Sequence, residues 1–365
     1  MVPEQVIFEH EALHGPRSRR STEPRCLGVR NRITVVAMSR FTLSPRILGW
    51  MVVGCLASLP ANAVVSGVQV TEGKDRVTIT VDGDLLTELR FEGAPKPYFY
   101  PLNGPGGVGL TRNFPMRTDA ADEDKDHAHH RSLWFTHGDV NGVDFWAEGT
   151  NKGKVVQTRI LEARGGDESG TVRTANKWVT PEGKTLLTDV TSLRVHRSPL
   201  GRMFDYEIAL TASEGIDVTF GDTKEGTMAV RLAESMRLKA NKHYAGKPTG
   251  RILQNTGVKD DSTWGKRASW TAYTGPVDGK PMSVVIFDHP SNPRYPTWWH
   301  VRDYGLFAAN PFGVHDFEKK PAGTGNLVVK AGDMVRFRYR FLLLSGQADP
   351  ATLGSVASAF GNLSE

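Results

Sequence analysis

The chain has 365 residues, with 45 basic and 40 acidic side chains and a formal net charge of +5 at pH 7. Residues 1–63 hold eight arginines and four glutamates, so the rest of the chain carries 37 basic and 36 acidic residues and is nearly neutral. This balance excludes a basic surface for nucleic acid. Both cysteines, Cys26 and Cys55, also precede residue 64, which excludes a disulfide or a thiolate nucleophile from the remainder.

The N-terminal residues have the features of an export signal. Basic residues precede an apolar segment at 47–59, and a small-x-small cleavage sequence follows at 61–63. The apolar segment is too short to span a bilayer. Residues 38–63 are therefore predicted to be a signal peptide that directs the protein to the periplasm or the cell exterior, and residues 1–37 a disordered leader or a mis-assigned start. Lipid attachment at Cys55 is the alternative.

Residues 64–365 are predicted to form one domain made mostly of β-strands. Apolar and polar residues alternate in most segments, for example at 204–210 and 335–341. Turn sequences at 181–184 and 277–280 each separate two such segments, as in hairpins. About fifteen short strands need two stacked sheets, because one large twisted sheet splits or curls.

A helix is predicted only at the end of the chain, over residues 350–362. Asp349 can cap its N-terminus, and Pro350 suits the first helical position. The chain shows no internal repeat and no linker. The expected fold class is therefore all-β, a large antiparallel β-sandwich with a short C-terminal helix.

The densest group of reactive side chains lies at 126–146. Four of the eleven histidines of the chain fall within eleven residues of this segment. Such a concentration is unusual for a packing role, because each buried imidazole must be hydrogen-bonded. If 131–137 is a strand, Arg131 and His137 share one of its faces and His130 lies on the other.

Three interpretations of this segment remain open. His127 and His129, together with a third histidine or with Asp139 or Asp144, have ligand types that suit a divalent metal ion. The same side chains, beside the tryptophans, also suit a metal-free site for a sugar or a similar polar ligand. Alternatively, the segment is a solvated loop whose histidines bond only to the backbone.

Later segments add further candidates. Glu225 lies in a charged loop, and His289 directly follows a buried strand. Residues 294–305 combine two tryptophans with His, Arg and Asp, which favours a ligand platform over a core. No Gly-x-Ser-x-Gly, His-Glu-x-x-His or dinucleotide motif occurs, so the catalytic candidates are histidines and carboxylates acting as acid and base.

The candidate catalytic residues are His130, His137, Glu225, His289 and His300. The candidate substrate-binding residues are Arg112, His129, Arg131, Asp139, Asp144, Trp298, Trp299, Arg302, Asp303 and Asn310. One pocket is expected to be lined by His129, His130, Arg131, His137, Glu225, Trp299 and His300, because polar groups beside aromatic rings are tolerated around a shared wet cavity. No organic cofactor is expected, and a divalent metal is the alternative.

Four segments resemble a bacterial family labelled PmoA, or methane oxygenase PmoA, which is elsewhere called a domain of unknown function. They are YFYPLNGPGGVGLTRNFPM (98–116), DHAHHRSLWFTHGDVNGVDFW (126–146), GDTKEGTMAVRLAESMR (221–237) and DHPSNPRYPTWWHVRDYGLFAANPFG (288–313). A membrane methane monooxygenase subunit needs several apolar spans of about twenty residues. Residues 64–365 contain none, so the methane label is interpreted as an inherited misnomer.

Members of this family are similar to galactose-mutarotase-like β-supersandwich proteins and often accompany sugar oxidoreductases. In mutarotase-like enzymes a His and a Glu on the concave sheet exchange protons with the anomeric hydroxyl and the ring oxygen. The resemblance implies that His130, His137, His289 or His300 is the acid and that Glu225 is the base.

These observations give three functional hypotheses. The first is an exported carbohydrate-active enzyme, of epimerase, lyase or hydrolase type, that acts on a sugar or an oxidised sugar. The second is a non-catalytic glycan-binding β-sandwich, and the third is a metal-dependent oxygenase, as the family label implies. The expected partner is a small molecule or an oligosaccharide, without nucleic acid and without a transmembrane span, and the oligomeric state is left open.

Overall fold

The computed structural model describes residues 66–347 and 349–363, which belong to one compact unit. The signal peptide at 38–63, the leader at 1–37 and the lipid attachment at Cys55 lie outside the described residues and stay predictions. Over the described part of the chain, no helix is both long and apolar enough to cross a membrane.

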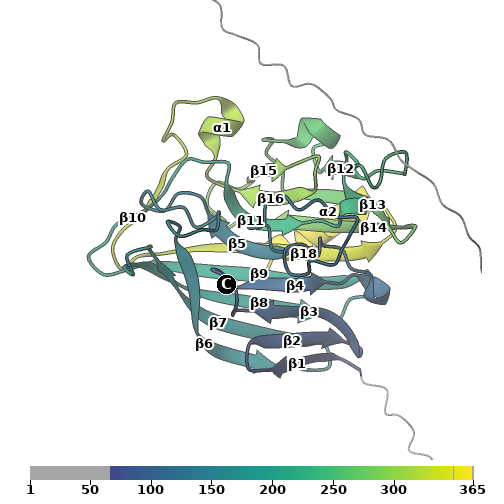
Figure 1. Cartoon of the computed structure of the whole chain (residues 1–365), viewed down its shortest axis with the longest axis horizontal. Coiled ribbons are helices and arrows are strands. Elements are labelled where there is room, and N and C mark those ends of the chain that lie inside the picture. The colour runs from purple at the N-terminus through teal and green to yellow at the C-terminus, as the bar shows by residue number, and fades with distance from the viewer. Residues whose placement is uncertain (1–65, 348, 364–365) are drawn as a thin grey trace, which may run out of the picture. The chain divides into compact units, whose positions relative to one another are not determined.

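Eighteen strands and two α-helices are found in the described residues (Figure 1). The strands are β1 (Val68–Glu72), β2 (Arg76–Val81), β3 (Asp84–Arg90), β4 (Tyr98–Leu102), β5 (Leu133–His137), β6 (Lys154–Arg164), β7 (Ser169–Val179), β8 (Thr185–His196), β9 (Arg202–Ala212), β10 (Val218–Phe220), β11 (Gly226–Arg231), β12 (Arg251–Gln254), β13 (Trp270–Val277), β14 (Lys280–Asp288), β15 (Trp298–Val301), β16 (Leu306–Asn310), β17 (Leu327–Val329) and β18 (Met334–Ser345). The α-helices are α1 (Val314–Glu318) and α2 (Pro350–Gly361), and three 3-10 helices are η1 (Pro105–Gly107), η2 (Glu234–Met236) and η3 (Asp260–Thr263).

The strands form two large antiparallel sheets that stack as a sandwich. The first sheet has the order β1-β2-β3-β4-β5-β11-β16-β15, and the second has the order β12-β13-β14-β18-β9-β8-β7-β6. A small sheet pairs β10 with β17. The predicted all-β sandwich with a C-terminal helix is confirmed; the short helix α1 was not predicted.

The core lies between the two sheets because alternate side chains of each strand point inward. In β18, Phe337, Tyr339 and Phe341 are fully buried, whereas the arginines between them face outward. Inward side chains of the two sheets meet directly: the ring centroids of Phe135 in β5 and Phe337 lie 6.1 Å apart. Dispersion and burial of apolar surface therefore hold the sheets together.

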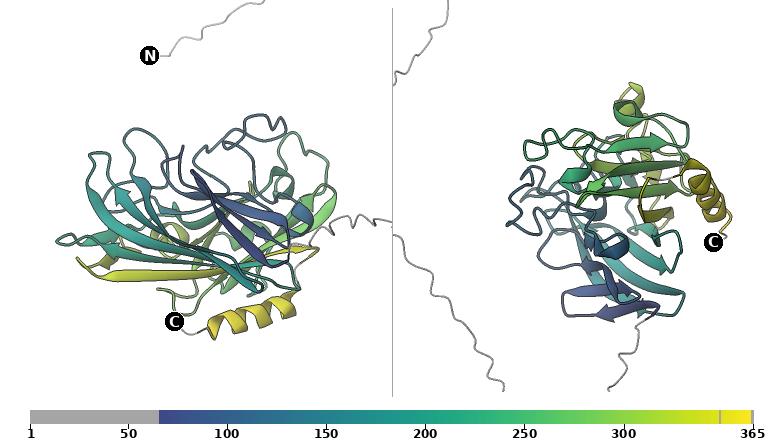
Figure 2. Two further views of the ribbon diagram at one scale, coloured as in Figure 1. Left: turned by 90° about the horizontal axis from the view of Figure 1, so that it is seen from below. Right: turned by 90° about the vertical axis from the view of Figure 1, so that its right-hand side faces the viewer.

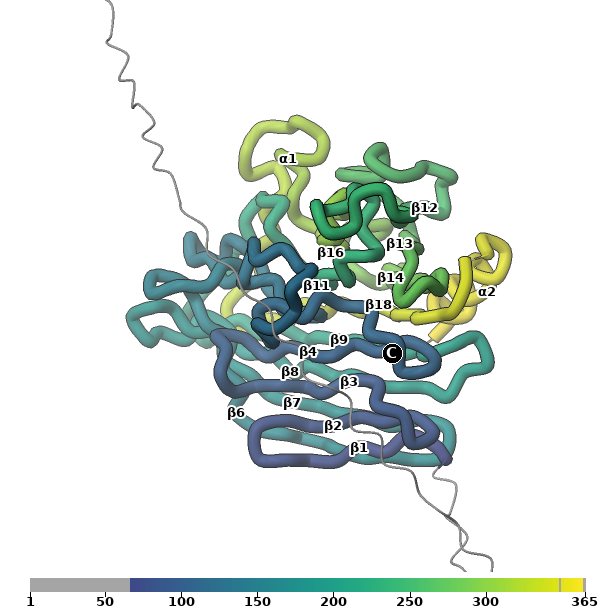
Figure 3. Tube along the Cα trace, turned by 45° about the vertical axis from the view of Figure 1, so that its right-hand side comes forward, coloured from purple at the N-terminus to yellow at the C-terminus, as the bar shows by residue number. Residues whose placement is uncertain are grey.

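The two outer faces of the sandwich are covered by different elements. Helix α2 lies against the outer face of the second sheet, where Leu353 and Phe360 pack on Trp270 and Phe287 (Figure 2, left). The N-cap Asp349 accepts a hydrogen bond from the backbone of Thr352, as the sequence predicts. The outer face of the first sheet is covered by loops, which Figure 3 shows in front of β4 and β11. The two outer faces are consequently separate environments for binding.

Candidate functional site

A row of small side chains crosses the outer face of the first sheet. Cross-strand pairing aligns Trp134 of β5 with Ala229 of β11, Ala229 with Ala308 of β16, and Ala308 with His300 of β15. The two alanines are fully buried and lie in one cluster with Trp134 and Tyr304. Because an alanine fills little space above a sheet, side chains from the loops reach this face.

Trp134 of this row and three rings from the loops form a stack of four aromatic rings, which we call the ring stack. The centroid of Tyr304 lies 5.4 Å from that of His127, His127 lies 4.8 Å from His130, and His130 lies 5.3 Å from Trp134. The planes of successive rings differ by 10°, 14° and 22°. His129 packs edge-on against His130 at 4.4 Å. Three histidines of the dense segment therefore share one place on the outer face of the first sheet.

Asp126 orients the most accessible of these imidazoles. Its carboxylate lies 2.8 Å from Nδ1 of His127, and the two side chains are 40% and 41% exposed. When Nδ1 donates to this carboxylate, Nε2 of His127 is the unprotonated nitrogen and carries a lone pair. A carboxylate that fixes the tautomer of a half-exposed histidine is the arrangement that a general base requires.

His130 is held in the opposite tautomer. Nη1 of Arg231 lies 3.2 Å from Nδ1 of His130, and because a guanidinium can only donate, this nitrogen accepts and Nε2 carries the proton. Burial, with smaller contributions from the neighbouring His129 and Arg231, holds the pKa of His130 well below its ordinary value. His130 is therefore a neutral hydrogen-bond donor beside the base. Burial likewise lowers the pKa of His129 to about 4.

Buried charges fix the loop that carries these histidines. Arg112 is fully buried and donates to the carbonyl oxygens of Phe114, Asp124, Asp126 and His127. It also pairs with the Asp126 carboxylate.

Arg231 donates to the same oxygen of Asp126 at 3.1 Å. Although burial raises the pKa of the Asp126 carboxyl, the hydrogen bond from His127 and the charges of Arg231 and Arg112 outweigh it, so the pKa lies well below its usual value. Asp126 is therefore ionised across the physiological range and keeps His127 oriented.

A second group of polar side chains also contacts Tyr304. The guanidinium of Arg302 is 5.5 Å from the ring of Tyr304 and 5.9 Å from that of Trp264. A pocket of about 250 Å³ opens here, lined by Ile252, Asp261, Trp264, Val301, Arg302 and Asp303. Glu225 is half-exposed and pairs with Lys224 at 3.3 Å. Burial raises the pKa of Tyr304, and the charge of Glu225 adds a smaller contribution in the same direction. The predicted residues Arg302, Asp303 and Glu225 thus extend the polar surface that begins at His127.

His300 lies beside this pocket but is not exposed. Its Nδ1 accepts a hydrogen bond from Nε1 of Trp264 at 3.0 Å. Burial lowers the pKa of His300 to about 3, so the ring is neutral. His300 therefore positions Trp264, and its predicted role as a proton donor has no support in its surroundings.

The prediction that His137 shares the pocket is wrong. His137 is fully buried at the core side of β5, where its Nε2 lies 2.7 Å from the carbonyl oxygen of Gly221 and its ring packs on Phe220 and Phe312. His130 precedes β5 and stacks on Trp134 at the outer face of the sheet. His137 is consequently a structural residue.

The burial of His137 predicts a specific loss of stability in acid. Burial lowers its pKa to about 4, whereas a histidine of the unfolded chain titrates near 6.5. As the pH falls through this interval the unfolded state binds the proton first, so up to about 3 kcal/mol of stability is lost. In His137→Gln, which keeps a donor for Gly221, urea unfolding at about pH 7 and about pH 4.5 should differ less than in the wild type. An unchanged difference would contradict this assignment.

Three further predicted residues lie away from the ring stack. Trp299 is fully buried in the core between the sheets and donates to the carbonyl oxygen of Ala268, so the prediction that it lines the pocket is wrong. Trp298 faces outward, where its Nε1 donates to Glu318. His289 packs against Phe360 of α2, on the outer face of the second sheet, and cannot share a site with His130.

Other predicted ligand residues hold the backbone. Asp139 accepts from the backbone of Gly142, and Asp144 accepts from two backbone amides and from Lys152. Asn310 donates to the carbonyl oxygens of Thr223 and Lys224 and thereby positions the loop before Glu225. Arg131 forms a bidentate pair with Glu148. The side chains of these residues therefore make their hydrogen bonds within the protein.

Asp126, Arg231 and Tyr304 were not predicted as site residues. Each is next to a predicted site residue or lies in a segment that contains one, but only the three-dimensional contacts reveal their roles. For a metal, the described residues contain no group of three or more His, Cys, Asp or Glu side chains placed to hold an ion. A bound metal is not tested by this geometry and stays an open prediction, which elemental analysis can settle.

The fold and the site define an all-β sandwich protein with a histidine-rich polar site on one outer face. Residues 76–358 match a family of unknown function, DUF6807, and the chain belongs to this family. The family description carries no PmoA label. No curated protein matches the chain.

Several solved structures are similar to the chain at low sequence identity. An α-galactosidase from Lactobacillus brevis matches 76% of the chain at 8% identity with a TM-score of 0.41, and the chain spans only 39% of that protein. A galactose mutarotase related enzyme from Lactobacillus acidophilus matches 77% of the chain and 99% of its own length, at 9% identity and a TM-score of 0.29. A galactose mutarotase-like protein from Lactobacillus casei ATCC 334 matches 76% of the chain and 100% of its own length, at 8% identity and a TM-score of 0.30. At such values these similarities do not bear on substrate or reaction.

Proposed function

We propose that this protein is an exported carbohydrate-active enzyme that uses acid and base catalysis at the ring stack. The single observation that supports this most is the pairing of Asp126 with His127, at 2.8 Å, on an otherwise largely buried aromatic surface. Only one imidazole of the stack is both oriented by a carboxylate and about two-fifths exposed. Export rests on the predicted signal peptide at 38–63 and stays part of the proposal.

The surroundings of His127 suit a polyhydroxylated substrate. Aromatic surface such as that of Trp264, which lines the pocket, suits the apolar face of a sugar ring, and the charged groups of Arg302 and Asp303 bond to hydroxyls. The ring of Tyr304 contacts both His127 and Arg302, which lines the pocket. A sugar that spans this surface would contact the base at one end and the arginine at the other.

The proton transfers follow from the two tautomers. Nε2 of His127 takes a proton from the substrate, and the ionised Asp126 stabilises the imidazolium that forms. The neutral His130, whose Nε2 carries a proton, donates a hydrogen bond to a developing negative charge. Glu225 is the group that supplies or removes the second proton. This set suits epimerisation, or elimination next to a carbonyl group, in a sugar or an oxidised sugar.

A turnover screen tests this proposal. Purified protein is incubated with simple glycosides and with 3-keto-glycosides, and the products are separated by chromatography. Turnover of at least one compound that disappears in Asp126→Asn supports the proposal, because the amide cannot hold His127 in the same tautomer with the same charge. Saturable binding with no turnover of any compound would contradict it and favour the non-catalytic glycan-binding alternative.

A further inference from the structure

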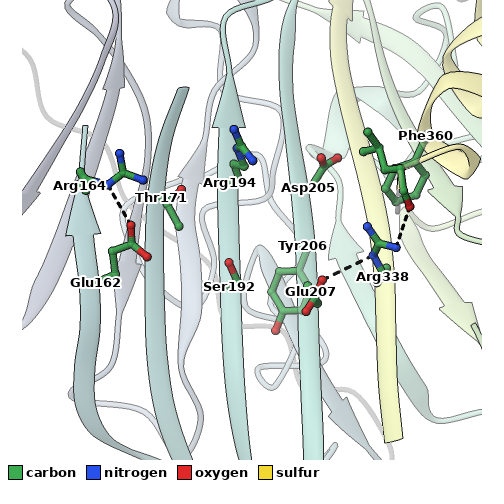
Figure 4. Close-up of a pocket in the computed structure, with 11 residues that line it drawn as sticks. Glu162, Arg164, Thr171, Ser192, Arg194, Asp205, Tyr206, Glu207, Arg338 and Phe360 are labelled. Atoms are coloured by element: carbon green, nitrogen blue, oxygen red, sulfur yellow. Dashed lines mark hydrogen bonds and ion pairs between the residues drawn. The ribbon is translucent and has the colours of Figure 1, made fainter. Parts of the chain in front are cut away.

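Two rows of polar side chains cross the outer face of the second sheet, on the opposite side of the sandwich from the ring stack (Figure 4). In the first row, Thr171 of β7 pairs with Arg194 of β8, which pairs with Asp205 of β9. In the second row, Ser192 pairs with Glu207, which pairs with Arg338 of β18. Strand register therefore brings hydroxyl, carboxylate and guanidinium groups together on one surface.

This surface is hollowed into a cavity of about 390 Å³. The cavity is lined by Glu162, Arg164, Thr171, Ser192, Arg194, Asp205, Tyr206, Glu207, Arg338, Phe360 and Leu363. The short side chains of Thr171 and Ser192 leave space in the middle of the sheet, and the end of α2 forms one wall. A cavity of this volume has room for a monosaccharide unit.

The charged groups at the α2 side are held in fixed positions. Asp205 accepts two hydrogen bonds from Arg340, at 2.7 and 2.9 Å, and lies 2.9 Å from Nε2 of His196. Arg338 donates to the carbonyl oxygen of Leu363, and its side chain is only 12% exposed. A ligand that enters the cavity would meet groups that lose little further freedom on binding.

Arg194 differs from these groups because it forms no ion pair within the described residues. Its hydrogen bond within the described residues is a long one to the hydroxyl of Ser169, at 3.4 Å, and no described carboxylate lies within 4.0 Å of its guanidinium. The carboxylates of Asp205 and Glu207 instead pair with arginines of β18. The cavity thus presents a free guanidinium beside two hydroxyl groups.

We propose that this cavity is a second binding site, separate from the ring stack, which takes a sugar that bears a carboxylate. The carboxylate of a hexuronate binds the fork of Arg194 through two parallel hydrogen bonds. The sugar hydroxyls bond to Ser192, Thr171 and the carboxylate of Glu207. The site goes beyond the proposed catalytic function, because it lies on the other sheet and needs none of the residues of the ring stack.

Calorimetric titration of the full chain tests this second site. Glucuronate is the probe. Glucose has the sugar hydroxyls without a carboxylate, and acetate has a carboxylate without the sugar ring. Glucuronate should bind at least about tenfold more tightly than either, and Arg194→Ala should weaken it by about tenfold or more, because a charge-assisted bidentate contact is lost. Arg194→Lys keeps the charge without the two parallel donors, so its affinity for glucuronate should lie between those of the wild type and Arg194→Ala. Arg251→Ala removes an exposed arginine from the opposite edge of the same sheet and should leave binding unchanged.

The outcomes separate this site from the proposed active site. The component of glucuronate binding that Arg194→Ala removes should be unchanged in His127→Ala, whether or not the ring stack also binds glucuronate. Absence of glucuronate binding, equal binding by the wild type and Arg194→Ala, or loss of binding in His127→Ala alone would each overturn the inference. None of these results depends on whether the ring stack catalyses a reaction.

Discussion

Replacing His127 by Ala is expected to lower turnover of the sugar substrate by about 10²- to 10⁴-fold, the range for removal of a general base. The reason is that His127 is the half-exposed imidazole of the ring stack and carries a lone pair on Nε2, whereas Nδ1 of His130 is already bonded to Arg231. Because the side chain is 41% exposed, its loss should change the melting temperature little. Initial rates and thermal unfolding of the same preparation provide the measurement.

A matched control for this variant is His315→Gln. His315 is exposed on α1 and bonds to the carbonyl oxygen of Lys320, without a place in the ring stack. Its replacement should leave turnover intact. If His127→Ala retained more than half of the wild-type rate, the assignment of His127 as the base would be wrong.

Replacing Arg112 by Ala is expected to destabilise the protein by about 3–5 kcal/mol, the range for breaking a buried ion pair. Four carbonyl oxygens and the carboxylate of Asp126 would lose a buried donor at once. The loop that presents His127 would lose its anchor, so turnover should fall together with stability. Urea unfolding and initial rates measure the two effects.

Arg117→Ala is the matched control, because this arginine lies in the same loop but is exposed and pairs only with Asp119. It should unfold at the same urea concentration as the wild type. A loss of less than about 1 kcal/mol in Arg112→Ala would show that the loop is held by other contacts, since losses above that size are what buried unpaired groups produce.

The fold could be predicted largely from alternation and turn chemistry. The alternation at 335–341 correctly placed aromatic residues inside and arginines outside, because one face of β18 is buried and the other is polar. The turn at 277–280 connects β13 to β14 with positive φ values at Asp278 and Gly279, as its Asp-Gly sequence predicts. The order of strands within each sheet was not predicted, because it depends on contacts between residues far apart in the chain.

The site was predicted only in part, and the error has a physical cause. His130 precedes β5 and stacks on Trp134 at the outer face, whereas His137 at the end of β5 packs on Phe312 in the core, yet the expectation of one pocket combined both residues. Density of histidines in the sequence indicated the right segment. It could not show that Asp126 would turn His127 into the exposed, oriented imidazole, because that contact depends on the loop that Arg112 holds in place.

The side chains that bind the backbone show a second limit. Asp139, Asp144 and Asn310 have the chemistry of ligand residues, but each satisfies backbone groups of a loop. Polar residue types in glycine-rich segments indicate turns as strongly as they indicate sites. A sequence alone does not distinguish a carboxylate that accepts from backbone amides from one that faces a ligand.

The most direct test of the central claim is to record the imidazole nitrogen resonances of the ¹⁵N-labelled protein while the sugar substrate is added. Variants that replace single histidines by Gln assign the signals. If the ring stack is the sugar site, the signals of His127 and His130 shift on addition of the sugar, while those of His137 in the core and His289 beside α2 stay in place. Shifts at His289 with unchanged signals from His127 and His130 would contradict the account.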